Sequence, residues 1–196
     1  MKYKFKLERD EMKKRSNILF AVVALLLAGA AVISAQKDPM VGGAAMFPTK
    51  NIIENAVNSS DHTTLVAAVK AAGLVETLEG TGPFTVFAPT NEAFAKLPAG
   101  TVDMLLKPEN KATLVKVLTY HVVAGHWSAN DIEKQIKAGH GKAELKTVSG
   151  GSLWAMWQGG KIVLKDEKGG MSTVTIADVF QSNGVIHVVD TVLMPN

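Results

Sequence analysis

The feature that most constrains the fold is a change of hydrophobic periodicity near residue 143. Between residues 51 and 139 apolar residues mostly recur at helical spacing, with capping residues and glycines at segment ends. From Ala143 onward the period is two, interrupted by the turn-forming pairs Gly150-Gly151, Gly159-Gly160 and Gly169-Gly170. Helices followed by strands predict an α+β fold in one domain.

One strand pattern lies among the helices. The stretch FTVFA, Phe84 to Ala88, is rich in β-branched and aromatic residues, and Thr90 is placed to cap a helix over 91–97. This strand must join the later sheet. A second short extended piece covers 121–123. Helices are predicted from 52, from Asp61 as N-cap to Gly73, and then over 74–80, 101–107, 110–120 and 128–139, the last opened by a Ser128/Asp131 capping box.

The N-terminus has the pattern of a secretory signal. Basic residues precede an uncharged apolar run, Ile18 to Ile33, and a small residue stands at the expected cleavage point, Ala35. An uncleaved inner-membrane anchor is the alternative. We therefore predict a signal over 1–35, a leader rich in Pro and Gly over 36–47 and one domain over 48–196. The protein is expected to be secreted or periplasmic, or anchored to the inner membrane or cell surface.

Composition excludes two kinds of chemistry. Residues 36–196 contain 14 Lys, no Arg and 15 Asp and Glu, so the net charge of +3 comes from the signal. Without arginine the chain lacks the planar fork that best recognises phosphates and bases, and nucleic acid is a poor partner. Membrane contact is expected only through the N-terminal segment, if it is retained. The chain has no Cys, hence no disulfide and no thiolate chemistry.

Three motifs identify a family resemblance. The stretches TVFAPTNEAF (Thr85 to Phe94), TYHVV (Thr119 to Val123) and NGVIHVVDTVLMP (Asn183 to Pro195) resemble, in order and spacing, the sequence boxes of fasciclin-like domains, in particular the single-domain bacterial type. The resemblance implies a β-wedge of about seven strands with flanking short α-helices. It also implies a secreted or surface adhesion role.

Tyr120 and His121 carry the first candidate site. A metal site needs three or four converging ligands, and His62, His121, His126, His140 and His187 form no such pattern in sequence. A catalytic His121 would need a nucleophile and an orienting acid, and no nucleophile elbow is present. We predict no enzyme activity, metal or cofactor. The favoured interpretation is structural, with a hydrogen-bonded His121 linking the preceding helix to the first strand, although the resemblance also implicates the Tyr-His stretch in partner recognition.

Asp178 and Val179 form the second candidate site. Some adhesive members of the family carry an Asp-Ile pair shortly before the closing Asn-Gly, and that pair is implicated in integrin binding. Asp178-Val179 occupies the matching place here, so both residues are predicted at or near the surface as partner contacts. The alternative is that Asp178 caps a turn.

The remaining motif residues are assigned structural roles: Thr85, Phe87, Pro89, Thr90, Asn91, Phe94, Asn183, Gly184 and His187. Alternation in the last strand places Val185, His187 and Val189 on one face, so His187 is expected to be a hydrogen-bonded or solvent-facing histidine. Gly184 is expected to supply a positive φ at the turn that starts this strand.

Trp154 and Met156 form the third candidate site, because the strand SLWAMW is apolar on both faces. Either the apolar leader, Met40 to Phe47, covers these two side chains, or they form an exposed patch for a partner; a crossed-over core is a lesser alternative. A tryptophan suits sugar rings, since its ring stacks while its N–H remains free.

Two function classes follow. The first is an adhesion or matrix module that binds cell-surface protein or polysaccharide. The second is a carrier of a small apolar ligand such as a pigment or lipid, which would need an apolar cavity of several hundred Å³.

Overall fold

The computed structural model describes residues 38–196, which form one compact unit. The predicted signal over 1–35 lies outside the described residues. Among residues 38–196 no helix has both the length and the apolar character needed to cross a bilayer.

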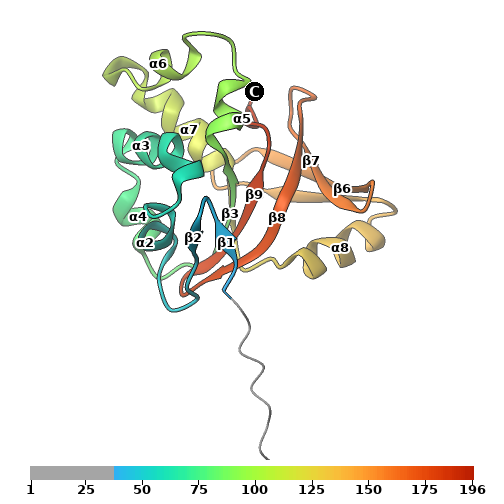
Figure 1. Ribbon diagram of the computed structural model, residues 1–196. Helices are drawn as coiled ribbons and strands as arrows, with labels where there is room; N and C mark the ends of the chain where they lie inside the picture. Colours follow the sequence, from blue (N-terminus) through green and yellow to red (C-terminus); the bar gives the residue numbers. More distant parts are fainter. Residues whose placement is uncertain (1–37) are drawn as a thin grey trace, which may run out of the picture. The chain divides into compact units, whose positions relative to one another are not determined.

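The helices are short and mostly precede the sheet strands, and the α+β class predicted from the sequence is confirmed (Figure 1). The helical elements are α2 Ile52–Ala56, η1 Ser60–His62, α3 Thr63–Ala72, α4 Val75–Glu79, α5 Asn91–Ala95, α6 Thr101–Leu105, η2 Pro108–Asn110, α7 Lys111–Tyr120 and α8 Ala129–Ala138. The strands are β1 Met40–Val41, β2 Ala44–Ala45, β3 Phe84–Pro89, β4 Val122–Ala124, β5 Lys142–Lys146, β6 Ser152–Gln158, β7 Lys161–Lys165, β8 Met171–Gln181 and β9 Gly184–Val189.

Seven strands form one sheet in the order β4-β3-β9-β8-β7-β6-β5. The early strand β3 pairs parallel with β9, and every other neighbouring pair is antiparallel. The sheet nearly closes on itself, because Val123 of β4 bridges to Thr147 just after β5, and Val148 donates a backbone hydrogen bond of 2.8 Å to Val122. This wrapped sheet is the seven-stranded wedge that the family resemblance implies.

Two hydrophobic clusters lie on opposite sides of β3 and β9. The inner cluster fills the wrapped sheet, with Phe87, Leu153, Leu164 and Val189 among its members, and α8 packs against it through Ile132. The outer cluster lies between the sheet and helices α2 to α7, which stand together on the left in Figure 1. Strand β9 is buried along its whole length because it has a core on each face.

Local signals explain where the helices begin. Ser128 and Asp131 form the predicted capping box of α8, and the Thr90 side chain accepts a hydrogen bond from Ala93 at the start of α5. The predicted cap at Asp61 is wrong, since that residue lies inside η1 and His62 occupies the N-cap position of α3 without a side-chain cap.

The leader predicted over 36–47 is part of the fold. β1 and β2 form a small hairpin in front of the helical layer, and Val41 and Met46 belong to the outer cluster (Figure 1). Gly42 accepts hydrogen bonds from the backbone and side chain of Ser60, and a Cβ at Gly42 would collide with Ser59. The domain start predicted at 48 is therefore too late, because the compact unit begins at Asp38.

Candidate functional site

Neither hydrophobic cluster extends to the outer face of β5, β6 and β7, although Val163 on this face is buried. The inward residues of these strands, such as Leu145, Leu153 and Leu164, belong to the inner cluster. Their outward neighbours Trp154 and Met156 are half-buried and belong to neither cluster. We call this outward surface the Trp154 face, defined by Lys142, Glu144, Lys146, Trp154, Met156, Lys161, Val163 and Lys165.

The strand register places one negative and one positive residue directly beside the tryptophan, and further lysines on the same face. Trp154 lies opposite Glu144 on one side and Lys165 on the other, while Met156 lies between Lys142 and Val163. The Lys142 ammonium sits 4.7 Å from the centre of the Trp154 ring. Four lysines and one glutamate therefore share one face of a domain whose overall charge is close to zero.

The predicted cover over Trp154 is wrong. The leader packs instead on the helical layer, through Val41 and Met46 in the outer cluster. The crossed-over core is also excluded, because Leu153 and Ala155 point inward and Trp154 and Met156 point outward in regular alternation. Trp154 and Met156 are half-buried on the outward face, so the patch alternative stays a prediction.

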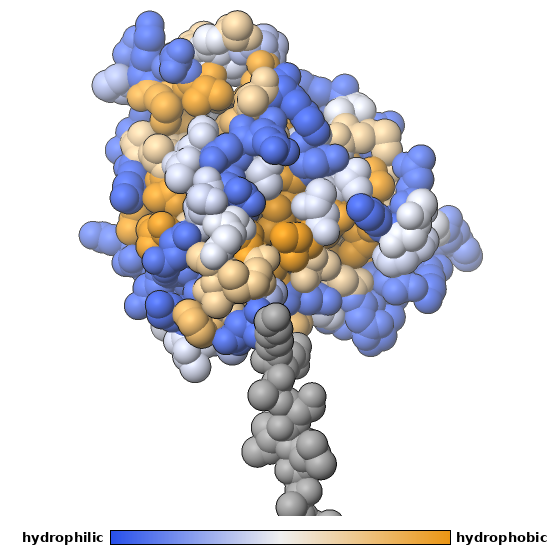
Figure 2. All heavy atoms as spheres, viewed as in Figure 1, coloured by the Kyte–Doolittle hydropathy of each residue, from blue (hydrophilic) through white to orange (hydrophobic). Residues whose placement is uncertain are grey.

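Figure 2, in the orientation of Figure 1, shows a second apolar region, on the side of the hairpin and the helices. Hydrophobic residues reach the surface in the middle and left of this view, whereas the lower right around α8 is largely hydrophilic. An apolar cavity of about 90 Å³ lies beneath this region, between the hairpin, helices α2 to α4, the end of α7 and the outer side of β3 and β9.

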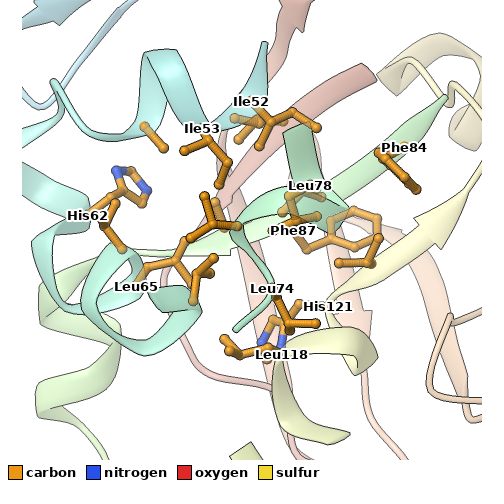
Figure 3. A pocket seen from close by; sticks show the side chains of 18 of the residues that line it. Ile52, Ile53, His62, Leu65, Leu74, Leu78, Phe84, Phe87, Leu118 and His121 are labelled. Atoms are coloured by element: carbon orange, nitrogen blue, oxygen red, sulfur yellow. The ribbon is translucent and has the colours of Figure 1, made fainter. Parts of the chain in front are cut away.

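The cavity is lined almost entirely by hydrocarbon. Figure 3 shows Ile52, Ile53, Leu65, Leu74 and Leu78 around it, with two imidazoles, His62 and His121, on different sides of the lining. Its other lining residues include the exposed Lys70, Thr77 and Val148, so the cavity reaches the surface. The volume falls short of the several hundred Å³ expected of a carrier of whole pigments.

Tyr120 is completely buried and holds two loops together. Its hydroxyl donates a hydrogen bond of 2.7 Å to the Ser152 carbonyl and accepts one of 3.1 Å from the Glu167 backbone N–H. Gly151 packs against the ring, where an added Cβ would be too close. A side chain with no exposed surface has no access to a partner in the folded state, so the hypothesis of a partner contact at Tyr120 is not supported.

His121 is also buried and bonds through both ring nitrogens. Nδ1 lies 2.9 Å from the Val117 carbonyl, and Nε2 accepts a hydrogen bond of 3.0 Å from the Leu193 N–H. The side chain therefore joins α7 to the segment after β9. The link to strand β3, which the sequence predicted, is made by the His121 backbone carbonyl, which accepts a hydrogen bond from Phe87 N. Since Nε2 must accept, the ring is neutral, and burial lowers the pKa of His121 to about 4.

Asp178 and Val179 do not form a surface pair. Val179 is buried in the outer cluster at 1% exposure, so the prediction that it lies at the surface is wrong. Asp178 lies in an irregular part of β8 with a positive φ of 58°, and its carboxylate accepts a hydrogen bond of 2.7 Å from Ala129 N at the start of α8. Asp178 therefore caps the start of α8 although it lies on a distant strand. This role is closer to the predicted turn cap than to a partner contact.

Replacing Asp178 with alanine should lower the free energy of unfolding by about 1–2 kcal/mol, because a helix cap is lost and alanine tolerates a positive φ poorly. Asp178→Asn is the matched control, since asparagine tolerates this φ and keeps an oxygen acceptor. Urea unfolding of both variants checks the expectation. Equal stability of the alanine variant and the unchanged protein would contradict the capping role.

The first and last boxes meet at His187. This histidine is fully buried, stacks on Phe87 with ring centres 5.6 Å apart, and joins Trp127 O to Asp178 N through its two ring nitrogens. Burial lowers the pKa of His187. Thr85, which pairs with Val185 in the parallel register, is also buried; its hydroxyl donates to Gly125 O and accepts from Trp127 N.

Two asparagines connect distant segments. Asn91, at the start of α5, accepts from Thr64 N and donates to Ser60 O, while Asn183 accepts from Ile52 N and donates to two carbonyls at the end of α4. Gly184 does not have the predicted positive φ. Glycine is required there because an added Cβ would collide with the Phe84 carbonyl in the parallel pair.

The other structural motif residues have local roles. Pro89 ends β3, and Phe94 is buried in the outer cluster at the end of α5. Among residues 38–196 no group of three or more His, Cys, Asp or Glu gathers at a distance that would hold a metal ion.

The fold matches that of a known class of adhesion domain. A FAS1 domain pair from the insect cell adhesion molecule fasciclin I superposes with a TM-score of 0.65 at 20% identity, covering 74% of this chain and 51% of that chain. At this identity the likeness shows the fold alone, a nearly closed sheet with short helices.

The sequence establishes the family. The fasciclin domain model matches residues 60–195, and this chain belongs to the fasciclin family. Protein sll1483 of Synechocystis is 47% identical over 176 residues, covering 90% of this chain and 91% of that protein. Cell surface glycolipoprotein MPB83 of Mycobacterium bovis is 34% identical, covering 85% and 70%. Fasciclin domains are generally extracellular, adhesion-related modules and typically non-enzymatic.

Sequence reasoning missed the lysines of the Trp154 face and the cavity histidine. Lys142, Lys161 and Lys165 occupy the polar positions of alternating strands, so aligning β5, β6 and β7 on their glycine turns could have placed all three on the same face as Trp154. Nothing in the sequence predicts that His62 lines a cavity, because a histidine just before a helix has no preferred structural role.

Proposed function

We propose that this protein is an extracellular adhesion module whose Trp154 face binds an acidic polysaccharide. The observation that carries the proposal is a half-buried indole on the outer face of the sheet, with Lys142 over its ring, Lys165 directly opposite it and two more lysines on the same face. An aromatic ring stacks on the apolar side of a sugar, and lysines hold the carboxylates or sulfates that the sugar carries.

The free charge on this face supports an anionic partner. Lys146 is paired with Glu144 at 2.6 Å. Lys142, Lys161 and Lys165 form no salt bridge with any residue between 38 and 196. Three unpaired ammonium groups on a sheet surface repel one another weakly and attract a polyanion, so the charge of the face is complementary to an acidic chain laid across the strands.

The Lys142 ammonium over the Trp154 ring does not prevent sugar stacking. An exposed cation–π contact contributes about 0.5–1 kcal/mol, so the flexible lysine can leave the ring when an acidic group offers a stronger contact. The same movement brings the ammonium to the edge of the ring, where it can bind the carboxylate of a stacked uronic acid.

We expect Trp154→Ser to weaken binding to alginate, a uronate polymer, about fivefold or more, while the free energy of unfolding falls by less than about 2 kcal/mol because the side chain is only half-buried. Trp157→Ser is the matched control: Trp157 lies on the same strand, is 48% exposed and points to the opposite face. Biolayer interferometry against immobilised alginate measures the affinity, with neutral dextran as the uncharged comparison.

The controls separate this proposal from its competitors. Alginate binding should weaken as sodium chloride rises from about 0.05 to 0.5 M, since screening shortens the reach of the lysines. Equal losses for Trp154→Ser and Trp157→Ser, or a loss of several kcal/mol in the stability of Trp154→Ser, would remove the Trp154 face as the binding site. Binding to anionic phospholipid vesicles without binding to alginate would assign the face to a membrane surface instead.

A second candidate function, the carriage of a small apolar ligand, is favoured by the cavity beneath the hairpin. An apolar cavity of about 150 Å³ holds benzene, so about 90 Å³ holds about three or four heavy atoms. A volume of this size would hold the end of an aliphatic chain. The rest of the chain would leave the cavity where its lining is exposed, at Lys70, Thr77 or Val148. n-Pentane should therefore raise the melting temperature by binding the folded state.

A further inference from the structure

His62 carries the buried side-chain atom that lacks a hydrogen-bond partner among residues 38–196, its Nε2. The side chain is 4% exposed and lines the cavity beneath the hairpin. Its other nitrogen, Nδ1, lies 2.9 Å from the Ser59 hydroxyl, and this hydrogen bond fixes the ring. An unpaired buried polar atom costs about 1–3 kcal/mol, so a partner at Nε2 would be stabilising.

The surroundings of Nε2 do not suit a water molecule. A buried water makes about three hydrogen bonds, and the cavity beside His62 is lined by Ile53, Leu65 and Val69. The Ala88 backbone contributes a hydrogen-bonding contact that raises the pKa of His62, but this contact falls short of a full hydrogen bond to Nε2. The lining beside the ring is otherwise mostly apolar, which suits a ligand with its own apolar body better than water.

The charge state of the ring decides which polar group fits. Burial lowers the pKa of His62, so the imidazole is neutral at pH 7, and its charged neighbour Asp61 is an anion. A carboxylate placed at the neutral His62 ring would be buried without a counter-charge beside it, which is costly, because the cation of the lining, Lys70, is an exposed residue. A hydroxyl group is neutral and can accept from an Nε2–H or donate to a bare Nε2, so it satisfies either tautomer that the Ser59 contact allows.

We infer that the cavity binds an aliphatic molecule ending in one hydroxyl group, with the hydroxyl hydrogen-bonded to His62 Nε2. The inference rests on the second proposed function, the carriage of a small apolar ligand, and names its ligand class. The alkyl chain lies against the leucines and isoleucines of the helical layer and leaves the cavity where its lining is exposed, at Lys70, Thr77 or Val148.

The test uses two probes of nearly equal size, 1-butanol and n-pentane. In the unchanged protein, 1-butanol should shift the ¹⁵N resonance of His62 Nε2 in a saturable way, and n-pentane should bind without that shift. His121 is an internal control in the same spectra: it also lines the cavity, but both its nitrogens are already bonded to Val117 and Leu193, so its resonances should not report a new hydrogen bond.

His62→Phe supplies the second measurement. The variant should lose about five- to tenfold in affinity for 1-butanol, the value of one hydrogen bond, while its affinity for n-pentane stays within about twofold. The quantity compared between the unchanged protein and His62→Phe is the ratio of the affinities for 1-butanol and n-pentane. Water solvates the alcohol more strongly than the alkane, so the two affinities within one protein are not compared directly.

The outcomes distinguish the inference from the function beneath it. If both probes bind and neither moves the His62 Nε2 resonance, the hydroxyl contact is refuted while the carriage of an apolar ligand stands. If neither probe binds at millimolar concentration, both are refuted. If His62→Phe does not fold, the resonance shift in the unchanged protein decides alone.

Discussion

His121→Ala should lower the free energy of unfolding by about 3 kcal/mol. The substitution removes the acceptor of the Leu193 N–H and the partner of the Val117 carbonyl, leaving both backbone groups buried, and it also empties the space of a fully buried ring. The C-terminal segment after β9 loses its attachment to α7, so the effect should extend to the edge of the inner cluster. Urea unfolding followed by circular dichroism measures the change.

His126→Ala is the matched control, because this histidine belongs to the same sequence stretch, is exposed, and only stacks on Phe180. Its cost should stay below about 1 kcal/mol. Zinc added to the unchanged protein should leave the melting temperature where it was. A rise of several degrees with zinc, or similar losses for the two variants, would count against a purely structural His121.

Acidification should destabilise the protein well before its carboxylates are protonated. Three buried histidines have lowered pKa values, chiefly through burial: His62, His187 and His121, the last at about 4. The unfolded chain binds these protons near pH 6.5 and the folded chain does not, so stability is complete above pH 6.5 and falls as the pH drops towards 4. His121 held neutral contributes about 1.4 kcal/mol per pH unit between pH 6.5 and its folded pKa of about 4, and His62 and His187 act in the same direction.

Unfolding curves at pH 7, 6 and 5 check this expectation. His121 alone should account for a loss of about 2 kcal/mol between pH 6.5 and pH 5, and His121→Gln should show a correspondingly shallower dependence. The carboxylates with lowered pKa values are Asp131, Glu144 and Glu167. Their contribution to stability is lost mainly below pH 5, the lowest pH measured, so the loss between pH 7 and pH 5 reports the histidines. Stability that is flat from pH 7 to pH 5 would mean that the buried imidazoles protonate without cost.

The local sequence determined the elements and their order. The Ser128/Asp131 box, the Thr90 cap and the paired glycines fix where helices and turns begin, because each acts within a few residues of itself. The period of two after Ala143 was enough to predict an α+β fold, and the three boxes identified the family that the comparisons confirm. The buried, hydrogen-bonded state of His121 was also expected, although its partner at Leu193 was not.

Only the tertiary structure decided which apolar surfaces are covered. The leader packs on the helical layer and not on Trp154, Val179 is buried, and His62 faces a cavity formed by segments from Val41 to Ile186. Periodicity shows which side of a strand or helix is apolar, but coverage depends on how the sheet curls and on which distant segment reaches that side. A tryptophan in a strand can lie either in a core or on an outward sheet face, and the sequence around Trp154 is the same in both cases. The seven strands wrap around the inner cluster, and this wrapping leaves Trp154 on the outward face.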